Sequence, residues 1–282
     1  MNITAKTLIP GEAINISKNC LLYNDDCLKI LPALEAESID MIFADPPYKL
    51  SNGGFTCHAG KAVSVNKGDW DKSKGLEQDF EFHKKWLSAC KRVLKPDGTI
   101  WISGTYHSIY TCGFVLQTLG YHILNDIVWF KPNASPNLSC RYFTASHETL
   151  IWARKSKSGK HTFNYEEMKN RCFKNDILKS PGKQMRSVWA ISTPSPQEKI
   201  YGKHPTQKPV ELLERIILAS TNPGDKVLDP FMGSGTTAIA TLRHHRIFIG
   251  IEMEKEYIEL AIKRIKDELG KNHTSLFAFS RR

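Results

Sequence analysis

The sequence predicts an α/β fold in which helices cover both faces of a mostly parallel sheet. Short apolar strands alternate with amphipathic helices through most of the chain. The length of 282 residues and the hydrophobic content of 41% suit one large domain with a small insertion. Two of the predicted strands end in an acidic residue followed by a turn, which is where ligands bind in open α/β sheets.

The N-terminal half supplies the first alternating elements. Residues 1–19 have weak periodicity and are expected to form an extended lead-in. Strands are expected at 21–23, 39–44 and 99–103, helices at 27–34, 77–94 and 108–119, a turn at 96–98, and an antiparallel pair at 123–130 and 147–153. Trp129 and Trp152 of that pair are expected in the core. Residues 49–74 are polar and rich in glycine, which predicts a functional loop over the site.

Regular elements resume after a segment of poor periodicity at 154–200. Helices are expected at 209–220, 236–243 and 255–269, and strands at 226–229 and 246–252. Pro209 marks the start of the first of these helices, and Gly270 is expected to cap the end of the last.

The charge distribution favours a polyanionic partner. The net charge is +10 and the isoelectric point is about 9.2. Residues 154–186 carry ten lysines and arginines against three acids, so this segment holds most of the excess. A solvated basic surface without a partner is the alternative interpretation.

The cysteine pattern and the hydropathy argue against several classes of protein. The seven cysteines are an odd number, widely spaced and without a Cys-x-x-Cys pair, so neither a disulfide framework nor a metal site is expected. No apolar run approaches the length of a membrane span, and residues 1–19 lack the pattern of a secretory signal. A cytoplasmic protein with reduced thiols is expected.

The downstream acidic turn predicts a nucleoside-containing cofactor. Gly233 and Gly235 lie between a strand and a helix, and Glu252 ends the next strand, at a spacing that suits hydrogen bonds to ribose hydroxyls. The third glycine of a dinucleotide fingerprint is absent, because position 238 is alanine. Asp229 would repel a phosphate but suits a sulfonium or an amine. S-adenosylmethionine carries both groups; a plain helix start or a phosphate loop are the alternatives.

The upstream acidic turn, Asp45-Pro46-Pro47-Tyr48, predicts a site for an amino group. The two prolines rigidify the turn, so the Asp45 carboxylate and the Pro46 carbonyl present two acceptors to the two hydrogens of an exocyclic amine. These hydrogen bonds draw the nitrogen lone pair out of ring conjugation and make it nucleophilic, while Tyr48 offers a flat face to a base. A rigid loop without chemistry is the alternative.

Together the two turns resemble those of the amino-methylating DNA methyltransferases. The order of the motifs, with the catalytic turn first and a basic segment between, is similar to the β group of that family. This resemblance implies a Rossmann-like S-adenosylmethionine-dependent methyltransferase fold with a mostly parallel, circularly permuted sheet of seven strands and a small inserted target-recognition region. The implied organisation is a catalytic half at 1–153, a basic target-recognition insertion at 154–202 and a cofactor-binding half at 203–282.

The resemblance also implies roles for individual residues. Asp45, Pro46, Pro47 and Tyr48 would be catalytic. Asp26 would contact the cofactor adenine, Glu252 the ribose, Asp229 and Phe231 the methionine end near Gly233 and Gly235, and Thr206, Gln207 and Lys208 the methionine carboxylate. Lys61, Lys67, Arg141 and Lys183 are candidate DNA contacts.

Four segments resemble the DpnA-like branch of these enzymes, which modifies GATC: 51–54, 67–71, 136–143 and 182–185. The resemblance implies transfer of a methyl group to adenine N6 in double-stranded DNA after base flipping, with acceptance of single strands left open. Cytosine-N4 methylation is the alternative within the family, although serine is more usual there at position 45. A non-catalytic DNA-binding module and an RNA or protein-amide methyltransferase are rivals from other classes.

The resemblance also implies partners and a setting. They are a homodimer, a cognate restriction endonuclease and the cytoplasm of a bacterium. Cytosine-C5 chemistry is excluded, because it uses a thiol beside proline and the sequence has no Pro-Cys pair.

Overall fold

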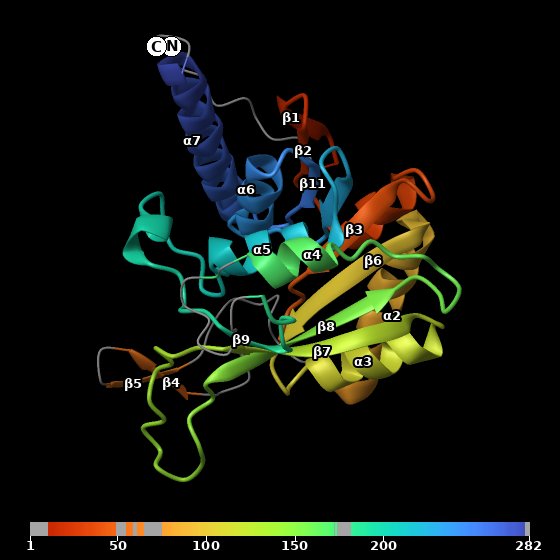
Figure 1. The fold of residues 1–282 in the computed structure, drawn as a ribbon. Coiled ribbons are helices and arrows are strands. Elements are labelled where there is room, and N and C mark those ends of the chain that lie inside the picture. The colour runs from red at the N-terminus through yellow and green to blue at the C-terminus, as the bar shows by residue number, and fades with distance from the viewer. Residues whose placement is uncertain are drawn as a thin grey trace.

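A computed structural model describes residues 11–48, 55–58, 61–64, 75–171, 173 and 182–279, with 55–58, 61–64 and 272–279 described as backbone. A twisted sheet runs through the centre, and helices cover both of its faces (Figure 1). Its strands are β1 (Ala13–Ser17), β2 (Cys20–Tyr23), β3 (Ile39–Ala44), β6 (Leu94–Gly104), β7 (His122–Phe130), β8 (His147–Arg154), β9 (Val188–Ala190), β10 (Lys226–Asp229) and β11 (Ile247–Ile251). The predicted α/β class is confirmed.

The strand order is β1-β2-β11-β10-β3-β6-β8-β7-β9. Within the central seven strands, β2 to β7 in this order, only β8 runs antiparallel to its neighbours. The predicted seven-stranded sheet is therefore present, and in the described residues β1 and β9 extend it at its two edges to nine. The expected antiparallel pair is β7 and β8.

Strands β3 and β10 lie side by side at the centre and run parallel, although they are far apart in the chain. Val227 pairs with Met41, and Leu228 with Ile42. Their carboxyl ends therefore reach the same edge of the sheet. This pairing brings the predicted catalytic turn at 45–48 and the predicted cofactor turn at 229–235 to the same edge.

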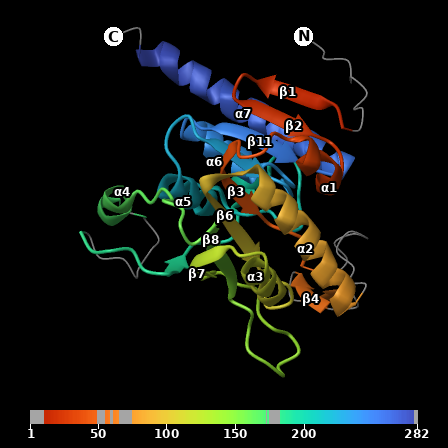
Figure 2. The same cartoon turned by 90° about the vertical axis from the view of Figure 1, so that its right-hand side faces the viewer.

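The helices form two layers. Helices α1 (Cys27–Ile30), α2 (Leu76–Val93) and α3 (Ile109–Thr118) cover one face, and α5 (Val210–Ser220), α6 (Thr236–Arg243) and α7 (Lys255–Phe279) cover the other (Figures 1 and 2). Side chains along β3 alternate between the two layers. Phe43 packs toward α5, and Ile42 and Ala44 pack toward α2 and α3.

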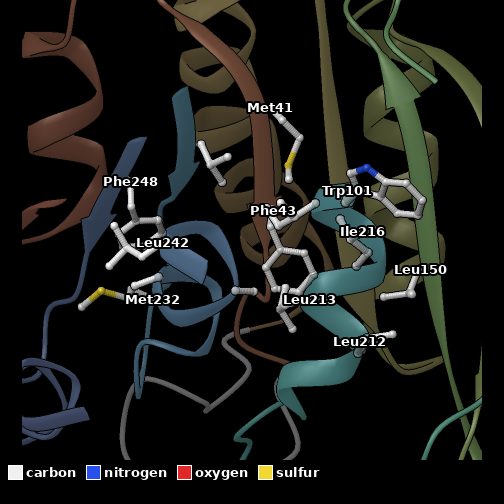
Figure 3. Close-up of a cluster of buried hydrophobic side chains, with 14 of the residues drawn as sticks. Met41, Phe43, Trp101, Leu150, Leu212, Leu213, Ile216, Met232, Leu242 and Phe248 are labelled. Atoms are coloured by element: carbon white, nitrogen blue, oxygen red, sulfur yellow. The ribbon is translucent and has the colours of Figure 1, made fainter. Parts of the chain in front are cut away.

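The core on the α5 side is closely filled. Leu212, Leu213 and Ile216 of α5 face Phe43 and Trp101 of the sheet (Figure 3). The rings of Trp101 and Trp152 stack with centroids 4.9 Å apart. Trp129 and Trp152 are both buried, which confirms their predicted place in the core.

Residues 13–17 of the expected lead-in are extended, as predicted, and form β1. Three other local expectations were wrong. The backbone within the supposed loop 49–74 forms a hairpin of β4 (Phe55–His58) and β5 (Lys61–Ser64). The expected turn at 96–98 lies inside β6, where a register shift against β3 accommodates it. Gly270 does not end α7, because one glycine costs a helix only about 1 kcal/mol.

The basic segment is attached to the rest of the fold. It contains α4 (Tyr165–Asn170), β9 and a 3₁₀ helix, η3 (Pro196–Lys199); a second, η1 (Leu31–Ala33), follows α1. Asn164 donates from its side chain to the carbonyls of Leu218 and Thr221, both at 2.8 Å, which fixes α4 to the end of α5. Strand β9 pairs with β7.

Among the described residues, none of the helices has both the length and the hydrophobicity of a transmembrane span.

Candidate active site

The carboxyl ends of the central strands surround a cavity of about 250 Å³, far more than the ~30 Å³ of one water molecule. All of the predicted catalytic residues and all but one of the predicted cofactor residues line it: Asp26, Asp45, Pro46, Pro47, Tyr48, Thr206, Gln207, Lys208, Asp229, Phe231, Gly233 and Glu252. Gly235 is the exception. The sheet therefore joins the two predicted sites into one.

The predicted catalytic turn follows β3, and both carboxylate oxygens of Asp45 have partners. Asp45 Oδ1 accepts a hydrogen bond from the Tyr48 hydroxyl at 2.5 Å, and Asp45 Oδ2 lies 2.5 Å from the Lys208 ammonium. Tyr48 is 4% exposed, and Lys208 Nζ lies 5.1 Å from its ring centroid. The predicted acceptor for an amine is thus occupied by an ammonium from the protein itself.

A second buried carboxylate, Glu148, lies beside Asp45. Glu148 Oε2 lies 3.0 Å from the Tyr48 hydroxyl and 3.4 Å from Lys208 Nζ, while Oε1 lies 2.9 Å from Lys131 Nζ. The Ser103 hydroxyl is 3.0 Å from that of Tyr48 and 3.3 Å from Glu148 Oε2. Two carboxylates and two ammonium groups therefore alternate along this cluster.

The cluster perturbs the pKa values of its members. Burial raises the pKa of Asp45, and Lys208 only partly offsets this effect. Burial would also raise the pKa of Glu148, but Lys208 and Lys131 together lower it to about 2. Burial would lower the pKa of Lys208, yet Asp45 and Glu148 raise it above its usual value. Glu148 and Lys208 are therefore charged at neutral pH.

Asp229 ends β10 and organises the turn that follows. Its Oδ1 accepts from the Phe231 backbone N–H at 2.9 Å, and its Oδ2 accepts from the Thr237 hydroxyl at 2.6 Å. Burial raises the pKa of Asp229 to about 7, against the effect of these two hydrogen bonds, and the charge of Asp45 adds to the rise. A cation in the cavity would therefore stabilise the charged form of Asp229.

The two glycines of this turn are required by conformation and packing. Gly233 and Gly235 have φ angles of 53° and 78°, in the left-handed region. A Cβ at Gly235 would lie 3.0 Å from that of Ala261 on α7, and one at Gly233 would lie 3.1 Å from the His204 ring. The turn thus packs against protein on these sides, in addition to bordering the cavity.

Glu252 follows β11 and lies opposite that turn. Its Oε2 accepts from the Gly233 backbone N–H at 2.7 Å, and its Oε1 accepts from that of Glu254 at 2.8 Å. Burial raises its pKa to about 7. Asp26 caps α1 by accepting from the Leu28 N–H at 2.9 Å, and the Asn24 side chain ties β2 to the Glu252 carbonyl at 2.8 Å.

The segment before α5 closes the cavity. Gln207 donates to the Glu198 carbonyl at 2.9 Å, but its Oε1 is buried and has no partner in the described structure. Thr206 Oγ1 lies 3.3 Å from His204 Nδ1. Lys208 points toward Asp45 and Glu148, so its predicted contact with a methionine carboxylate stays a prediction.

The donor set fits S-adenosylmethionine. Six carboxylates line the cavity (Asp25, Asp26, Asp45, Asp229, Glu252 and Glu254), and Lys208 is the one lysine or arginine among the described lining residues. Such a cavity favours a cation that carries hydroxyl donors and disfavours a pyrophosphate. The unpaired Gln207 Oε1 offers an acceptor to a ligand amine.

The predicted DNA contacts lie elsewhere. Arg141 and Lys183 are exposed and do not line the cavity. Arg141 lies in the long loop between β7 and β8, where Tyr142 is 70% and Phe143 is 99% exposed. The Lys61 side chain and Lys67 lie outside the described residues.

Sequence reasoning missed Glu148, Lys131 and Ser103. They lie at the start of β8, just after β7 and near the end of β6, and no local motif marks them as functional. The one available signal was the antiparallel pairing of β7 and β8. It brings the start of β8 to the same edge as the ends of its neighbours.

Comparison with known proteins agrees with this geometry. Residues 39–263 match the DNA methylase family that comprises the N6 and N4 enzymes. Over 249 residues, 88% of this chain and 90% of the relative, the chain is 54% identical to the type II methyltransferase M2.DpnII of Streptococcus pneumoniae. It is 48% identical to M2.MboI of Moraxella bovis over 247 residues, 88% of each chain.

Solved structures agree as well. The M1.HpyAVI–SAM complex superposes with a TM-score of 0.63 at 31% identity, covering 87% of this chain and 98% of the other. The cytosine-N4-specific PvuII methyltransferase, 23% identical, shares the fold with a TM-score of 0.67 over 88% of this chain and 86% of the other.

Fold and site thus define an α/β methyltransferase. The chain belongs to the DNA methylase family of the N6 and N4 type. The predicted class of enzyme and its S-adenosylmethionine dependence are confirmed.

Proposed function

We propose that this enzyme transfers a methyl group from S-adenosylmethionine to adenine N6 in double-stranded DNA, within GATC. One observation carries the chemistry: Asp45 and Asp229 end adjacent parallel strands and line one cavity. The site for an amine and the site for a cationic methyl donor are therefore contiguous. The similarity to M2.DpnII and M2.MboI over most of both chains supports the adenine and GATC assignments.

The cofactor supplies an electrophilic methyl group on a sulfonium. Phe231, Glu252, Asp26 and Gln207 would hold it in the cavity, with the Asp229 carboxylate favouring its positive charge. Asp45 accepts a hydrogen bond from the target amine and keeps the nitrogen lone pair directed at the methyl group. The amine loses its extra proton after transfer, so Asp45 acts as an acceptor and need not remove a proton first.

We propose that the exposed loop between β7 and β8 and the basic segment at 154–202 contact DNA. The exposure of Arg141, Tyr142 and Phe143 on one loop supports this role, because guanidinium and aromatic groups bind phosphates and bases. The excess of positive charge at 154–186 supports contact with the phosphate backbone of DNA.

We also propose a homodimer, a cognate restriction endonuclease and a bacterial cytoplasmic setting. The type II names of the relatives support a place in a restriction–modification system. Sedimentation of the purified protein tests the dimer. Protection of methylated GATC duplex from an endonuclease of the same specificity tests the pairing.

A single incubation tests the main proposal. The protein is mixed with methyl-labelled S-adenosylmethionine and a duplex containing one GATC site, and the DNA is digested to nucleosides. Label in N6-methyldeoxyadenosine is expected, with none from a matched duplex in which GATC is scrambled. Label in N4-methyldeoxycytidine would replace the adenine assignment with the alternative, and absence of label would refute the function.

A further inference from the structure

The Lys208 ammonium occupies the place that the proposed function assigns to the target base. It lies 2.5 Å from Asp45 Oδ2, the acceptor expected to bind the amine, and 5.1 Å from the centroid of the Tyr48 ring, the surface expected to stack on the base. The other oxygen, Asp45 Oδ1, already accepts a hydrogen bond from the Tyr48 hydroxyl. The target amine and Lys208 therefore compete for the same oxygen.

The structure also contains a second acceptor for this ammonium. Glu148 Oε2 lies 3.4 Å from Lys208 Nζ, so the two side chains already form an ion pair, which a small rotation of the lysine side chain shortens. The side chain of Lys208 is 6% exposed and that of Glu148 is 11% exposed. A buried ammonium without a counterion is strongly disfavoured, and Lys208 can leave Asp45 only if another carboxylate accepts it.

We propose that Glu148 is a positioning residue, which receives the Lys208 ammonium when the target amine takes its place on Asp45. The proposal rests on the proposed function, and it assigns Glu148 no contact with the base. Lys131 pairs with the other oxygen of this carboxylate, Oε1, at 2.9 Å, so Oε2 remains the acceptor for Lys208. Lys208 thus neutralises Asp45 until the substrate arrives and then moves aside without losing a partner.

The test compares binding of two duplexes in the presence of saturating sinefungin, an unreactive cofactor analogue. One carries adenine at the target position and the other carries purine, which lacks the amino group. The cost of unpairing each base from the duplex is the same for every variant. A change in the ratio of the two dissociation constants therefore reports on the amine site alone.

Glu148→Gln is expected to reduce this preference for adenine about tenfold, because Lys208 then stays on Asp45 and blocks the amine. The charge-balanced double variant Glu148→Gln/Lys208→Met is expected to restore the ratio to within about threefold of wild type, the margin of a modest change in binding. Lys131→Met is the matched control, since it removes the other ion pair of Glu148 but leaves Lys208 able to move. Its ratio is expected to match that of wild type.

An unchanged ratio in Glu148→Gln overturns the proposal, including the case in which both duplexes bind equally more weakly. Failure of the double variant to restore the ratio also overturns it, because Glu148 would then act on the base directly. If Glu148→Gln does not fold, a ratio in the double variant more than about threefold below that of wild type overturns the proposal. Methylation of GATC by the wild-type enzyme is measured first, so failure of the proposed function is recognised separately.

Discussion

The Glu252 carboxylate accepts a hydrogen bond from the Gly233 backbone N–H at 2.7 Å, which ties the end of β11 to the turn after β10. The residue expected to hold the ribose therefore also fixes the turn that is predicted to bind the cofactor. A carboxylate oxygen has two lone pairs, so both functions are compatible.

Glu252→Ala is expected to weaken binding of S-adenosylmethionine and to lower the free energy of unfolding by about 1–3 kcal/mol, because the buried Gly233 N–H loses its acceptor. Calorimetric titration and urea denaturation measure the two effects. Glu254→Gln is the matched control: its backbone N–H bond to Glu252 remains, so its stability should stay within about 0.5 kcal/mol of wild type. Equal stability of Glu252→Ala and wild type would contradict the structural part of its role.

Stability without cofactor should fall as the pH rises from about 4 to about 7. The pKa of Asp229 is raised by burial from 3.8 to about 7, so the folded protein binds a proton in this range that the unfolded chain has released. The loss is on the order of 4 kcal/mol at most. Urea denaturation of wild type and of the isosteric Asp229→Asn between pH 5 and pH 8 measures it. Parallel curves for the two proteins would show that Asp229 does not titrate there.

Affinity for S-adenosylmethionine should rise between pH 6 and pH 8. Asp229 and Glu252, both with pKa about 7, become negative over this range and attract the sulfonium. S-adenosylhomocysteine, which lacks the sulfonium charge, is the control ligand and should show a weaker dependence. Identical pH profiles for the two ligands would rule out the attraction to the sulfonium.

Asp45→Ala should reduce turnover by a factor of at least about 100 and leave cofactor affinity within about threefold of wild type, since the loss is confined to the acceptor of the amine. Lys208 retains Glu148 as a counterion in this variant. Asp40→Asn serves as control, because Asp40 lies on the same strand and pairs with Lys95 at 2.6 Å, away from the cavity. Substantial activity in Asp45→Ala would remove Asp45 from the mechanism.

Arg141→Ala and Lys183→Ala should separate base contacts from phosphate contacts. Loss of a base contact is expected to weaken binding to the GATC duplex by about 1–3 kcal/mol and to relax discrimination against altered sites. Loss of a phosphate contact is expected to weaken binding to all duplexes alike and to lower the magnitude of the slope of log affinity against log salt concentration by about 1. Binding titrations over a range of salt concentrations give both quantities. If neither variant changes affinity, the exposed loop and Lys183 do not contact DNA.

The meeting of Asp45 and Asp229 could be predicted from the sequence. Both follow apolar strands, and the carboxyl ends of parallel strands share one edge of a sheet. The same reasoning placed Glu252 correctly, since it ends the next strand. The burial of Trp129 and Trp152 was predictable for a different reason, because large aromatic side chains within predicted strands usually belong to the core.

Glu148 was not predictable in this way. It begins an antiparallel strand, and whether its side chain meets Asp45 depends on the register of three strands and on the position of Lys208. The occupation of Asp45 by Lys208 is likewise a tertiary fact, since the two residues are 163 positions apart. The β4–β5 hairpin escaped notice because its strands are only four residues long, too short to establish a period.

The pairing of β3 with β10 has a consequence for synthesis in the cell. The predicted catalytic turn and the strand before it leave the ribosome early, yet the strand that pairs with β3 comes 186 residues later, as Met41 pairs with Val227. At ~5–20 residues per second, this delay is roughly 10–40 s. During that time the nascent chain lacks the β3 partner, and a chain that ends before β10 lacks both this strand and the turn that carries Asp229.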